Sequence, residues 1–381
     1  MDAQTIIAAA KAATGLSNFG DEGILDNLTR LVDALNTEAR LTERGLQSFQ
    51  GILTGQLINR LKVEDYLSQH PELLEKPVEK PLFLFGLPRT GTTLAINLLS
   101  VDPARRSFLR WEAFDSVPPP KKEELHAGPR YEKSQAQIDF SLKHAPHISA
   151  IHHEDADSPT ECQFSMSASF LAQYYAAMAE IPSWLNWFLY EADYTPAFQY
   201  QKRLFQLLQA ETGGRWTLKN PWHPLFLDTL TATYPDARLV MTHRDPVDVV
   251  GSACSLLKNV RPMFCDSVDP ISIGKEMLET FDVMIARTIA FKEKHGWDSI
   301  YDLQYAEMMA DPIGSMKKLY AHFDEPFTAE AEAAMNAYMA NNEQGKHGKH
   351  VYSLADYGLT KEQIREHYKG YTDRFNIPTK G

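Results

Sequence analysis

The spacing of apolar residues predicts helices in the first part of the chain. Apolar side chains recur there at intervals of three and four positions, which places them on one face of a helix. The first such run is Ile24, Leu25, Leu28, Leu31, Val32 and Leu35. A second run at Leu53, Leu57 and Leu61 precedes a break at Pro71. We therefore expect residues 1–76 to form a helical segment.

The pattern changes after this segment. Residues 82–85 (Leu-Phe-Leu-Phe) form a short apolar run between Pro81 and Gly86, which is typical of a strand buried on both faces. An apolar helical run over residues 94–99 follows a glycine-containing loop. The order strand, loop, helix is the first unit of an α/β fold.

A second unit of the same kind lies far downstream. Residues 238–242 (Arg-Leu-Val-Met-Thr) predict a strand, residues 243–246 a turn, and residues 247–257 a helix. Further short strands are expected at residues 216–218 and 298–303. Together the units predict an α/β protein with a P-loop-like three-layer fold, in which a central, mostly parallel sheet carries additional helical segments.

The expected organisation is a helical segment over residues 1–76 and an α/β domain over residues 77–381. Residues at about 120–210 are mostly helical and rich in aromatic side chains. Because no long linker frames them, we interpret them as an insertion that caps the sheet rather than as a separate domain.

Composition narrows the classes of function. The chain has 381 residues, of which 44% are hydrophobic and 23% are charged, so it is expected to form a core rather than to be disordered. Its net charge is −12, which argues against a protein that coats nucleic acid or an anionic membrane. A small anion held by a few local cations remains compatible with that charge.

The cysteines and the N-terminus add little that is specific. Cys162, Cys254 and Cys265 are too few and too scattered for a disulfide framework or a zinc site, and we expect reduced thiols. The first residues lack the basic start and apolar core of a secretory signal, and no apolar run reaches the about 18 residues of a membrane span. The expectation is a cytoplasmic enzyme without a membrane or nucleic-acid partner.

Residues 86–93, Gly-Leu-Pro-Arg-Thr-Gly-Thr-Thr, form the loop between the first predicted strand and helix. Main-chain N–H groups in such a loop bind anions, and Thr90, Thr92 and Thr93 add hydroxyl donors. Nucleotide triphosphatases carry Lys after the second glycine of this loop, where Thr92 stands here. Arg89 supplies a cation earlier in the loop. The pattern predicts an anion site, with a tight turn and helix cap as the alternative.

Residues 88–93 (Pro-Arg-Thr-Gly-Thr-Thr) resemble the 5′-phosphosulfate loop of sulfotransferases, which use 3′-phosphoadenosine 5′-phosphosulfate (PAPS) as sulfuryl donor. The family's second signature is an Arg at the end of a later strand and a Ser about eight residues on, and both bind the 3′-phosphate. Arg244 and Ser252 hold those places. Residues 218–223 (Leu-Lys-Asn-Pro-Trp-His) resemble the family's Lys-containing segment.

The resemblance implies a donor site made from several segments. Its expected members are Arg89, Thr90, Gly91, Thr92, Thr93, Arg244, Ser252, Lys346 and Lys349. Common cytosolic members carry Lys at the position of Arg89, so this chain is placed with the bacterial branch. Lys346 and Lys349 either close over the 3′-phosphate or belong to a solvated loop. Arg89 and Lys219 are expected to neutralise charge during transfer, and no metal is expected because the donor offers no triphosphate to chelate.

A general base must take the proton of the acceptor hydroxyl, and two candidates compete. Glu112 lies near the place where related protein-tyrosine sulfotransferases carry a catalytic glutamate. His152 and His153 lie at the separation from the loop at which other branches carry a catalytic histidine. We favour the histidine pair slightly, with Glu112 as orienting partner or alternative. Glu161 also resembles a family position, without an assigned role.

The sequence therefore predicts a PAPS-dependent sulfotransferase that acts on a hydroxyl of a small-molecule alcohol or phenol and releases PAP. A divergent P-loop phosphotransferase or NTPase is the alternative, and a non-catalytic scaffold is a third reading. Several aromatic side chains either line an acceptor pocket or form helix core. These are Phe164, Phe170, Tyr174, Tyr175, Trp184 and Trp187. The acceptor and the oligomeric state stay open.

Overall fold

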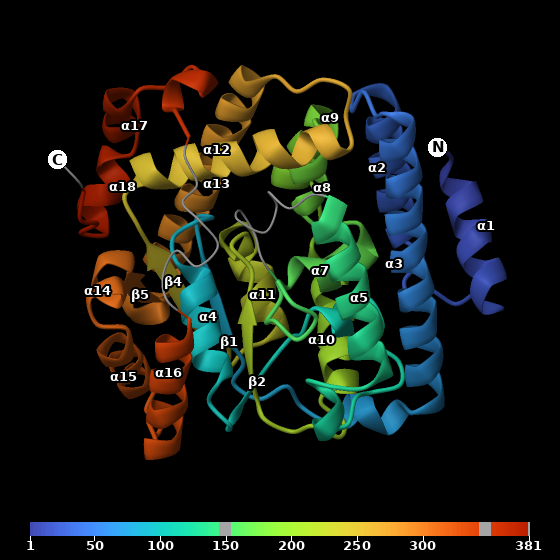
Figure 1. Cartoon of the computed structure of the whole chain (residues 1–381), viewed down its shortest axis with the longest axis horizontal. Coiled ribbons are helices and arrows are strands. Elements are labelled where there is room, and N and C mark those ends of the chain that lie inside the picture. The colour runs from blue at the N-terminus through green and yellow to red at the C-terminus, as the bar shows by residue number, and fades with distance from the viewer. Residues whose placement is uncertain (145–153, 343–351, 380–381) are drawn as a thin grey trace.

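A central parallel sheet organises the chain (Figure 1). The computed structural model describes residues 1–144, 154–342 and 352–379. Within these ranges the sheet has five strands in the order β2-β3-β1-β4-β5, and every neighbouring pair is parallel. The strands are β1 (Leu82–Gly86), β2 (Arg105–Ser107), β3 (Arg215–Lys219), β4 (Arg238–His243) and β5 (Tyr301–Gln304). The expected α/β fold class is confirmed.

Strand β1 lies in the middle of the sheet and is buried along its whole length. Because side chains alternate along a strand, Phe83 and Phe85 enter one core while Leu82 and Leu84 enter the other. Four helices build the second core: α4 (Thr92–Ser100), α14 (Tyr305–Ala310), α15 (Pro312–His322) and α16 (Ala329–Asn341). Two helical layers thus enclose the sheet, which is the three-layer arrangement.

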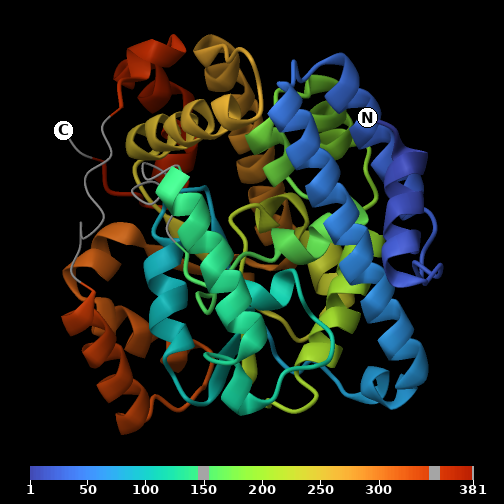
Figure 2. The ribbon, with the colours of Figure 1, turned by 45° about the vertical axis from the view of Figure 1, so that its right-hand side comes forward.

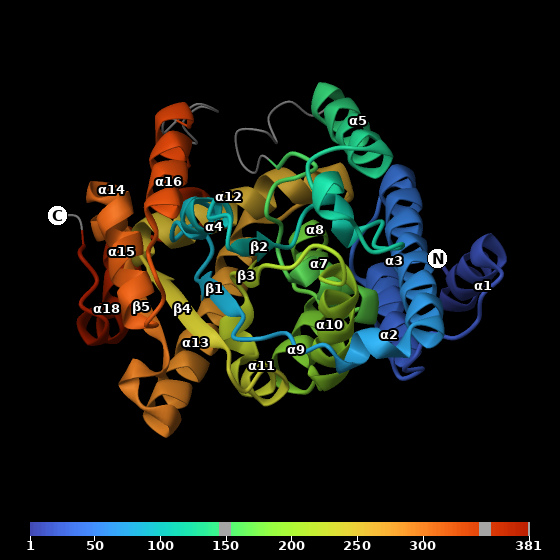
Figure 3. The ribbon, with the colours of Figure 1, turned by 90° about the horizontal axis from the view of Figure 1, so that it is seen from below.

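The first core is larger and holds most of the remaining helices. The N-terminal helices are α1 (Ala3–Thr14), α2 (Ile24–Thr37) and α3 (Glu43–Gln69). Those after β3 are α11 (Leu227–Thr233), α12 (Pro246–Val260), α13 (Pro270–His295), α17 (Lys361–His367) and α18 (Lys369–Arg374). Figure 3 shows α1–α3 at the opposite end of the molecule from α14–α16. The helices expected from both N-terminal apolar runs are confirmed as α2 and α3.

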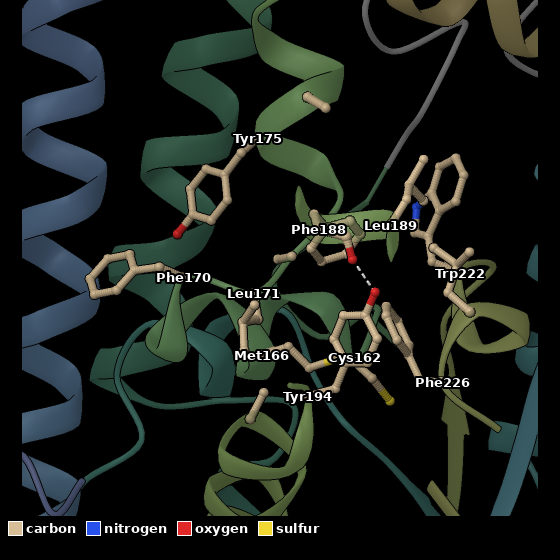
Figure 4. Packing of buried hydrophobic residues seen from close by; sticks show 14 of the residues in the cluster. Cys162, Met166, Phe170, Leu171, Tyr175, Phe188, Leu189, Tyr194, Trp222 and Phe226 are labelled. Atoms are coloured by element: carbon tan, nitrogen blue, oxygen red, sulfur yellow. Dashed lines mark hydrogen bonds between the residues drawn. The ribbon is translucent and has the colours of Figure 1, made fainter. Parts of the chain in front are cut away.

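The region between β2 and β3 is helical, as its sequence predicts. Its helices are α5 (Pro129–His144), α7 (Gln163–Met166), α8 (Tyr174–Met178), α9 (Pro182–Tyr190) and α10 (Thr195–Leu208). Many of its aromatic residues pack into a buried cluster (Figure 4), where the Tyr194 hydroxyl donates a hydrogen bond to the carbonyl of Phe188. Whether this region is an insertion in one domain, with a boundary at residue 76, stays a prediction.

Short 3₁₀ turns connect these elements. They are η1 (Pro71–Glu75), η2 (Trp111–Ala113), η3 (Lys122–Glu124), η4 (Ser167–Ser169), η5 (His223–Leu225), η6 (Arg261–Met263), η7 (Trp297–Ser299) and η8 (Leu354–Tyr357). All three cysteines are buried and none forms a disulfide. In the described ranges, no helix has the length and apolar character needed to cross a membrane.

Candidate functional site

The topology brings three predicted cations to one edge of the sheet. Parallel strands end at the same edge, and ligands of such sheets bind where the strand order switches direction. Here β1 lies between β3 and β4, and the register aligns Leu84 with Lys219. Arg89 follows β1, Lys219 ends β3 and Arg244 follows β4. The fold therefore explains how residues far apart in sequence form one site.

Two glycines allow the loop after β1 to bend closely against its surroundings. Gly86 has φ +151°, and a Cβ there would lie 2.5 Å from the carbonyl oxygen of Thr242. Gly91 has φ +98°, and a Cβ there would lie 2.8 Å from Cδ2 of Tyr305. Arg89 itself has φ +73°, although this left-handed conformation costs a residue with a side chain about 1–2 kcal/mol. Strain of this kind is typical of functional loops.

The two arginines of the site are tied to the protein and to each other. Arg89 Nε donates a hydrogen bond to Ser252 Oγ at 3.1 Å, and Arg244 Nη1 donates to the carbonyl of Arg89 at 3.0 Å. Arg244 also pairs with Asp248 at 3.1 Å and stacks on the ring of Tyr305 at 4.4 Å. Burial and the neighbouring Arg244 lower the pKa of Arg89. A bound anion would relieve this repulsion.

The hydrogen-bond donors around Arg89 and Arg244 differ in whether a ligand can reach them. Nε of Arg244 is buried and has no hydrogen-bond partner among the described residues, which fits an arginine that receives phosphate or sulfate oxygens. Thr92 and Thr93 line the adjoining cavity at the start of α4. The hydroxyl of Thr90 is instead fully buried and bonds to the Leu87 carbonyl and to Thr242. Any contribution of Thr90 to an anion site comes from its main chain.

Lys219 lies in the same region and is paired. Its Nζ is 3.1 Å from Oε1 of Glu161, while Gln163 Nε2 donates to the second oxygen of that carboxylate. The main chain holds the pair together, because the N–H of Cys162 donates to the carbonyl of Lys219 at 2.7 Å. The Glu161 carboxylate lines the cavity. The structure thus places an acidic side chain beside the expected transfer site.

Glu112 occupies a different environment. Its carboxylate is fully buried, pairs with Arg106 at 2.5 Å and accepts a hydrogen bond from the Leu109 N–H at 3.0 Å. It does not line the cavity. The carboxylate of Glu112 thus pairs with a buried arginine of β2 and lies away from the cavity lining. Its expected role as a general base or as the orienting partner of one stays a prediction.

Four other predicted residues cannot be placed. His152, His153, Lys346 and Lys349 lie outside the described residues, so their expected roles stay predictions. In the described ranges, no group of three or more His, Cys, Asp or Glu side chains is arranged to hold a metal ion.

One cavity of about 1150 Å³ joins these features to helices on the other side. The side where the sulfuryl donor is expected to bind, the donor side, contains Arg89, Gly91, Thr92, Thr93, Arg244 and Glu161. The other side of the cavity is formed mainly by α3, α5, α8 and α12. Figure 2 shows α5 between α4 and α3. Residues of α5 line the cavity together with residues of these two helices. The volume exceeds that of a typical site for one drug-sized ligand.

The aromatic residues of the capping region divide between cavity and core. Phe164 and Tyr174 line the cavity, and the guanidinium of Arg110 contacts the neighbouring rings of Phe114 (4.9 Å) and Phe164 (4.7 Å). Arg110 also pairs with Glu154 at 3.4 Å. The other aromatic residues belong to the core. Phe170, Tyr175 and Trp184 are fully buried there, and Trp187 is partly buried against it.

Comparison with known proteins decides the family. The model described as the sulfotransferase family matches residues 81–329. This chain belongs to the sulfotransferase family. The structure of sulfotransferase STF9 from Mycobacterium avium is similar to this sulfotransferase, with 34% identity, a TM-score of 0.93, and coverage of 100% of this chain and 98% of that chain. Sulfotransferase STF1 from Mycobacterium tuberculosis H37Rv has 32% identity and a TM-score of 0.87, over 96% and 98% of the two chains.

A curated relative is more distant in sequence. The omega-hydroxy-beta-dihydromenaquinone-9 sulfotransferase Stf3 of Mycobacterium bovis is 24% identical over 328 residues, which cover 78% of this chain and 75% of the relative. The expected sulfotransferase family is therefore confirmed. The region that matches the family model begins just before β1, so α1–α3 of this sulfotransferase lie outside it.

Several cavity residues were missed in the sequence of this sulfotransferase. Gly55, Ile58 and Lys62 of α3 line the cavity, and Tyr305 supports Arg244. The tertiary neighbours of Tyr305 leave no local sequence signal. Gly55 does leave one, because glycine inside a helix is about 1 kcal/mol less favourable than alanine, although Gly51 of the same helix leaves the same signal without lining the cavity.

Proposed function

We propose that this sulfotransferase transfers the sulfuryl group of PAPS to a hydroxyl of a small-molecule alcohol or phenol and releases PAP. The observation that carries the proposal is the contact between Arg89 and Arg244 at the start of α4. Two guanidinium groups and a helix N-terminus meet there, although the protein as a whole is acidic. Such an arrangement suits a small ligand with more than one anionic group.

Each donor group of the site has an assigned part in this proposal. The loop N–H groups, the hydroxyls of Thr92 and Thr93, and Arg89 bind the 5′-phosphosulfate. Arg244 and Ser252 bind the 3′-phosphate. When bound, PAPS supplies a sulfuryl group attached to a phosphate that can leave. Arg89 and Lys219 stabilise the negative charge that develops during transfer, which is the main contribution a protein makes to reactions of this type.

The acceptor hydroxyl must lose its proton, and Glu161 can take it. Among the described carboxylates of the cavity, Glu161 is the one in contact with Lys219. Its negative charge also favours the charged form of Arg89 and so opposes the lowering of the Arg89 pKa by burial. Lys219 orients the carboxylate toward the site. The histidine pair His152 and His153 stays a predicted alternative outside the described residues.

Two observations support the choice of donor and acceptor. Thr92 stands where a nucleotide triphosphatase needs Lys, which favours a sulfuryl donor over a triphosphate. The name of the Stf3 relative includes a hydroxylated menaquinone, and a hydroxyl acceptor of small-molecule type agrees with a cavity that is enclosed by protein on several sides.

A screen of alcohols and phenols with PAPS tests the proposal. We expect a sulfated product, detected by its mass shift, together with an equal amount of PAP. The same mixtures without PAPS serve as controls. Magnesium-dependent hydrolysis of ATP without any sulfated product would support the divergent phosphotransferase instead and would overturn the proposal.

A further inference from the structure

Helix α3 forms one wall of the cavity, although it lies outside the region that defines the family. The residues that face the cavity are Gly55, Ile58 and Lys62, at spacings of three and four, so they lie on one face of the helix. The opposite face carries Leu53, Leu57 and other fully buried residues of the main core. One helix therefore connects the core to the cavity.

The wall is fixed in place by polar contacts of the same helix. Asn59 Nδ2 donates a hydrogen bond to Ser116 Oγ at 2.9 Å. Arg60 Nε donates to the Phe19 carbonyl at 2.7 Å, and its guanidinium stacks on Tyr200 at 4.3 Å. These buried contacts join α3 to three separate parts of the chain. The cavity thus has a preformed surface rather than a loop on this side.

The glycine at position 55 is not required by packing. A Cβ built on Gly55 meets no atom within 4 Å, and the same holds for Gly51 one turn earlier. Gly45 at the start of α3 differs, since a Cβ there would lie 1.9 Å from the carbonyl oxygen of Phe264. Gly55 differs from Gly51 in one respect, because Gly55 lines the cavity and Gly51 does not. The space that Gly55 leaves open belongs to the cavity.

Part of the cavity lining is apolar. Side chains from α3, α7, α8 and α12 contribute to this part of the lining. They are Ile58, Phe164, Tyr174, Ala177, Leu256, Leu257 and Val260. Pockets of this composition bind apolar parts of ligands, and a few polar groups then fix their orientation. Glu161 and Arg110 are polar groups of the same cavity.

We propose that the acceptor carries an extended apolar part, which lies against α3 at Gly55 and between α3 and α12, while its hydroxyl points toward Glu161. The substrate class is thus a chain-bearing alcohol or phenol rather than a small polar one. The inference rests on the proposed function, because it names the acceptor of that reaction. Gly55 determines specificity, since any larger side chain would occupy the space of the apolar part.

Two matched substitutions test this. Gly55→Leu fills the open space, whereas Gly51→Leu adds the same side chain to the same helix at a position that does not line the cavity. Both replace a helix glycine and have room for a Cβ, so both variants should fold with a Tm at least equal to that of the wild type. The probes are 4-octylphenol and 4-methylphenol, which share a hydroxyl and differ in their apolar part.

Binding is measured by equilibrium dialysis in the presence of PAP, so that no turnover is needed. We expect the wild type to bind 4-octylphenol at least tenfold more tightly than 4-methylphenol. Gly55→Leu should lose at least tenfold in affinity for 4-octylphenol and less than threefold for 4-methylphenol. Gly51→Leu should bind both as the wild type does, and Gly55→Ala should lie between the wild type and Gly55→Leu.

Two results would overturn the inference. One is equal affinity of the wild type for the two phenols, and the other is an unchanged affinity of Gly55→Leu for 4-octylphenol. A failure of the proposed function looks different: PAPS would then give no sulfated product with any acceptor, while the pattern of phenol binding could still be as described. PAP binding should be the same in all four proteins, because the donor side is untouched.

Discussion

The donor side and the acceptor side of the cavity are built on opposite principles. On the donor side, Arg89, Arg244 and Ser252 hold one another through hydrogen bonds at the edge of the sheet. On the acceptor side, Gly55 and Ile58 present open space and apolar surface on a helix. Charge must be preorganised to act, so the donor side tolerates little change. Apolar space can be filled or enlarged without loss of the fold.

This difference predicts how substitutions should behave. A change on the donor side should affect the reaction with every acceptor equally. A change on the acceptor side should alter the order in which acceptors are preferred.

Arg89→Ala should cause the largest loss. Removing this cation from the transfer site should lower kcat/KM about 10³–10⁵-fold for all acceptors, as loss of a charge-stabilising arginine does in phosphoryl transfer. The fold should persist, since the residue lies on a loop. Arg89→Lys keeps the charge and should recover part of the activity. Rates measured by PAP release, with circular dichroism for the fold, check this. A loss of activity with only some acceptors would contradict the expected difference between donor-side and acceptor-side substitutions.

Glu161→Gln should lower kcat by about 10²–10⁴-fold, which is the usual contribution of a general base. The loss should shrink with 4-nitrophenol relative to 4-methylphenol, because a more acidic hydroxyl needs less help to lose its proton. A residue that only oriented Lys219 would produce the same loss with both phenols. Initial rates with the two acceptors at saturating PAPS distinguish these outcomes.

His223 makes the fold sensitive to acid. Its ring is fully buried among aromatic residues, and neither ring nitrogen has a partner in the described part of the chain. Burial lowers its pKa from 6.5 to about 3. Below pH 6.5, His223 is therefore protonated in the unfolded chain but stays neutral in the folded chain. The free energy of unfolding is highest above pH 6.5 and decreases as the pH falls toward 3.

Between pH 7 and pH 5 this histidine should cost about 2 kcal/mol of the free energy of unfolding. His223→Phe removes the titrating group and keeps a ring in the same surroundings, so its stability should fall by about 2 kcal/mol less over that range. Urea unfolding of both proteins at the two pH values measures the difference. His243, whose pKa burial also lowers, is present in both proteins and cancels. Identical pH dependence would contradict the assignment.

Tyr305→Leu should have the smallest effect. The ring supports the Arg244 guanidinium, and a contact of this type contributes about 0.5–2 kcal/mol. We expect PAP binding to weaken about 3–30-fold. AMP binding should change less, because AMP lacks the 3′-phosphate assigned to Arg244. Calorimetric titration with both nucleotides measures this, and equal weakening would show that Tyr305 contacts the nucleotide generally.

The sequence predicted the parts of the fold that have local signals. The apolar run of β1 and the units around β4 and α12 were correct because buried parallel strands and amphipathic helices show themselves over a few residues. Strand β2 was missed because it consists of Arg105-Arg106-Ser107. Its two arginines are buried with carboxylate partners, among them Glu325 for Arg105 and Glu112 for Arg106. Glu325 lies far from β2 in the sequence, so the local sequence around β2 gives no sign that Arg105 is buried in a strand.

The same holds for the site, where residues in local motifs could be predicted and residues placed by tertiary packing could not. Motif spacing identified Arg89, Lys219 and Arg244, which the parallel topology gathers at one edge. Glu112 was chosen from its distance along the chain, and its pairing with Arg106 depends on tertiary structure. The acceptor side was not predicted, because Gly55 and Ile58 come from a helix whose place beside the cavity is set by packing across the whole core.

Recognition of a 3′-phosphate by Arg244 and Ser252 is the feature that most distinguishes the proposed PAPS site from other nucleotide sites. The direct measurement compares the Tm of the protein with PAP and with AMP, which differ only in that phosphate. We predict that PAP raises the Tm by several degrees at concentrations where AMP leaves it unchanged. Equal stabilisation by the two nucleotides, or none by PAP, would contradict the assignment of this cavity as a PAPS site.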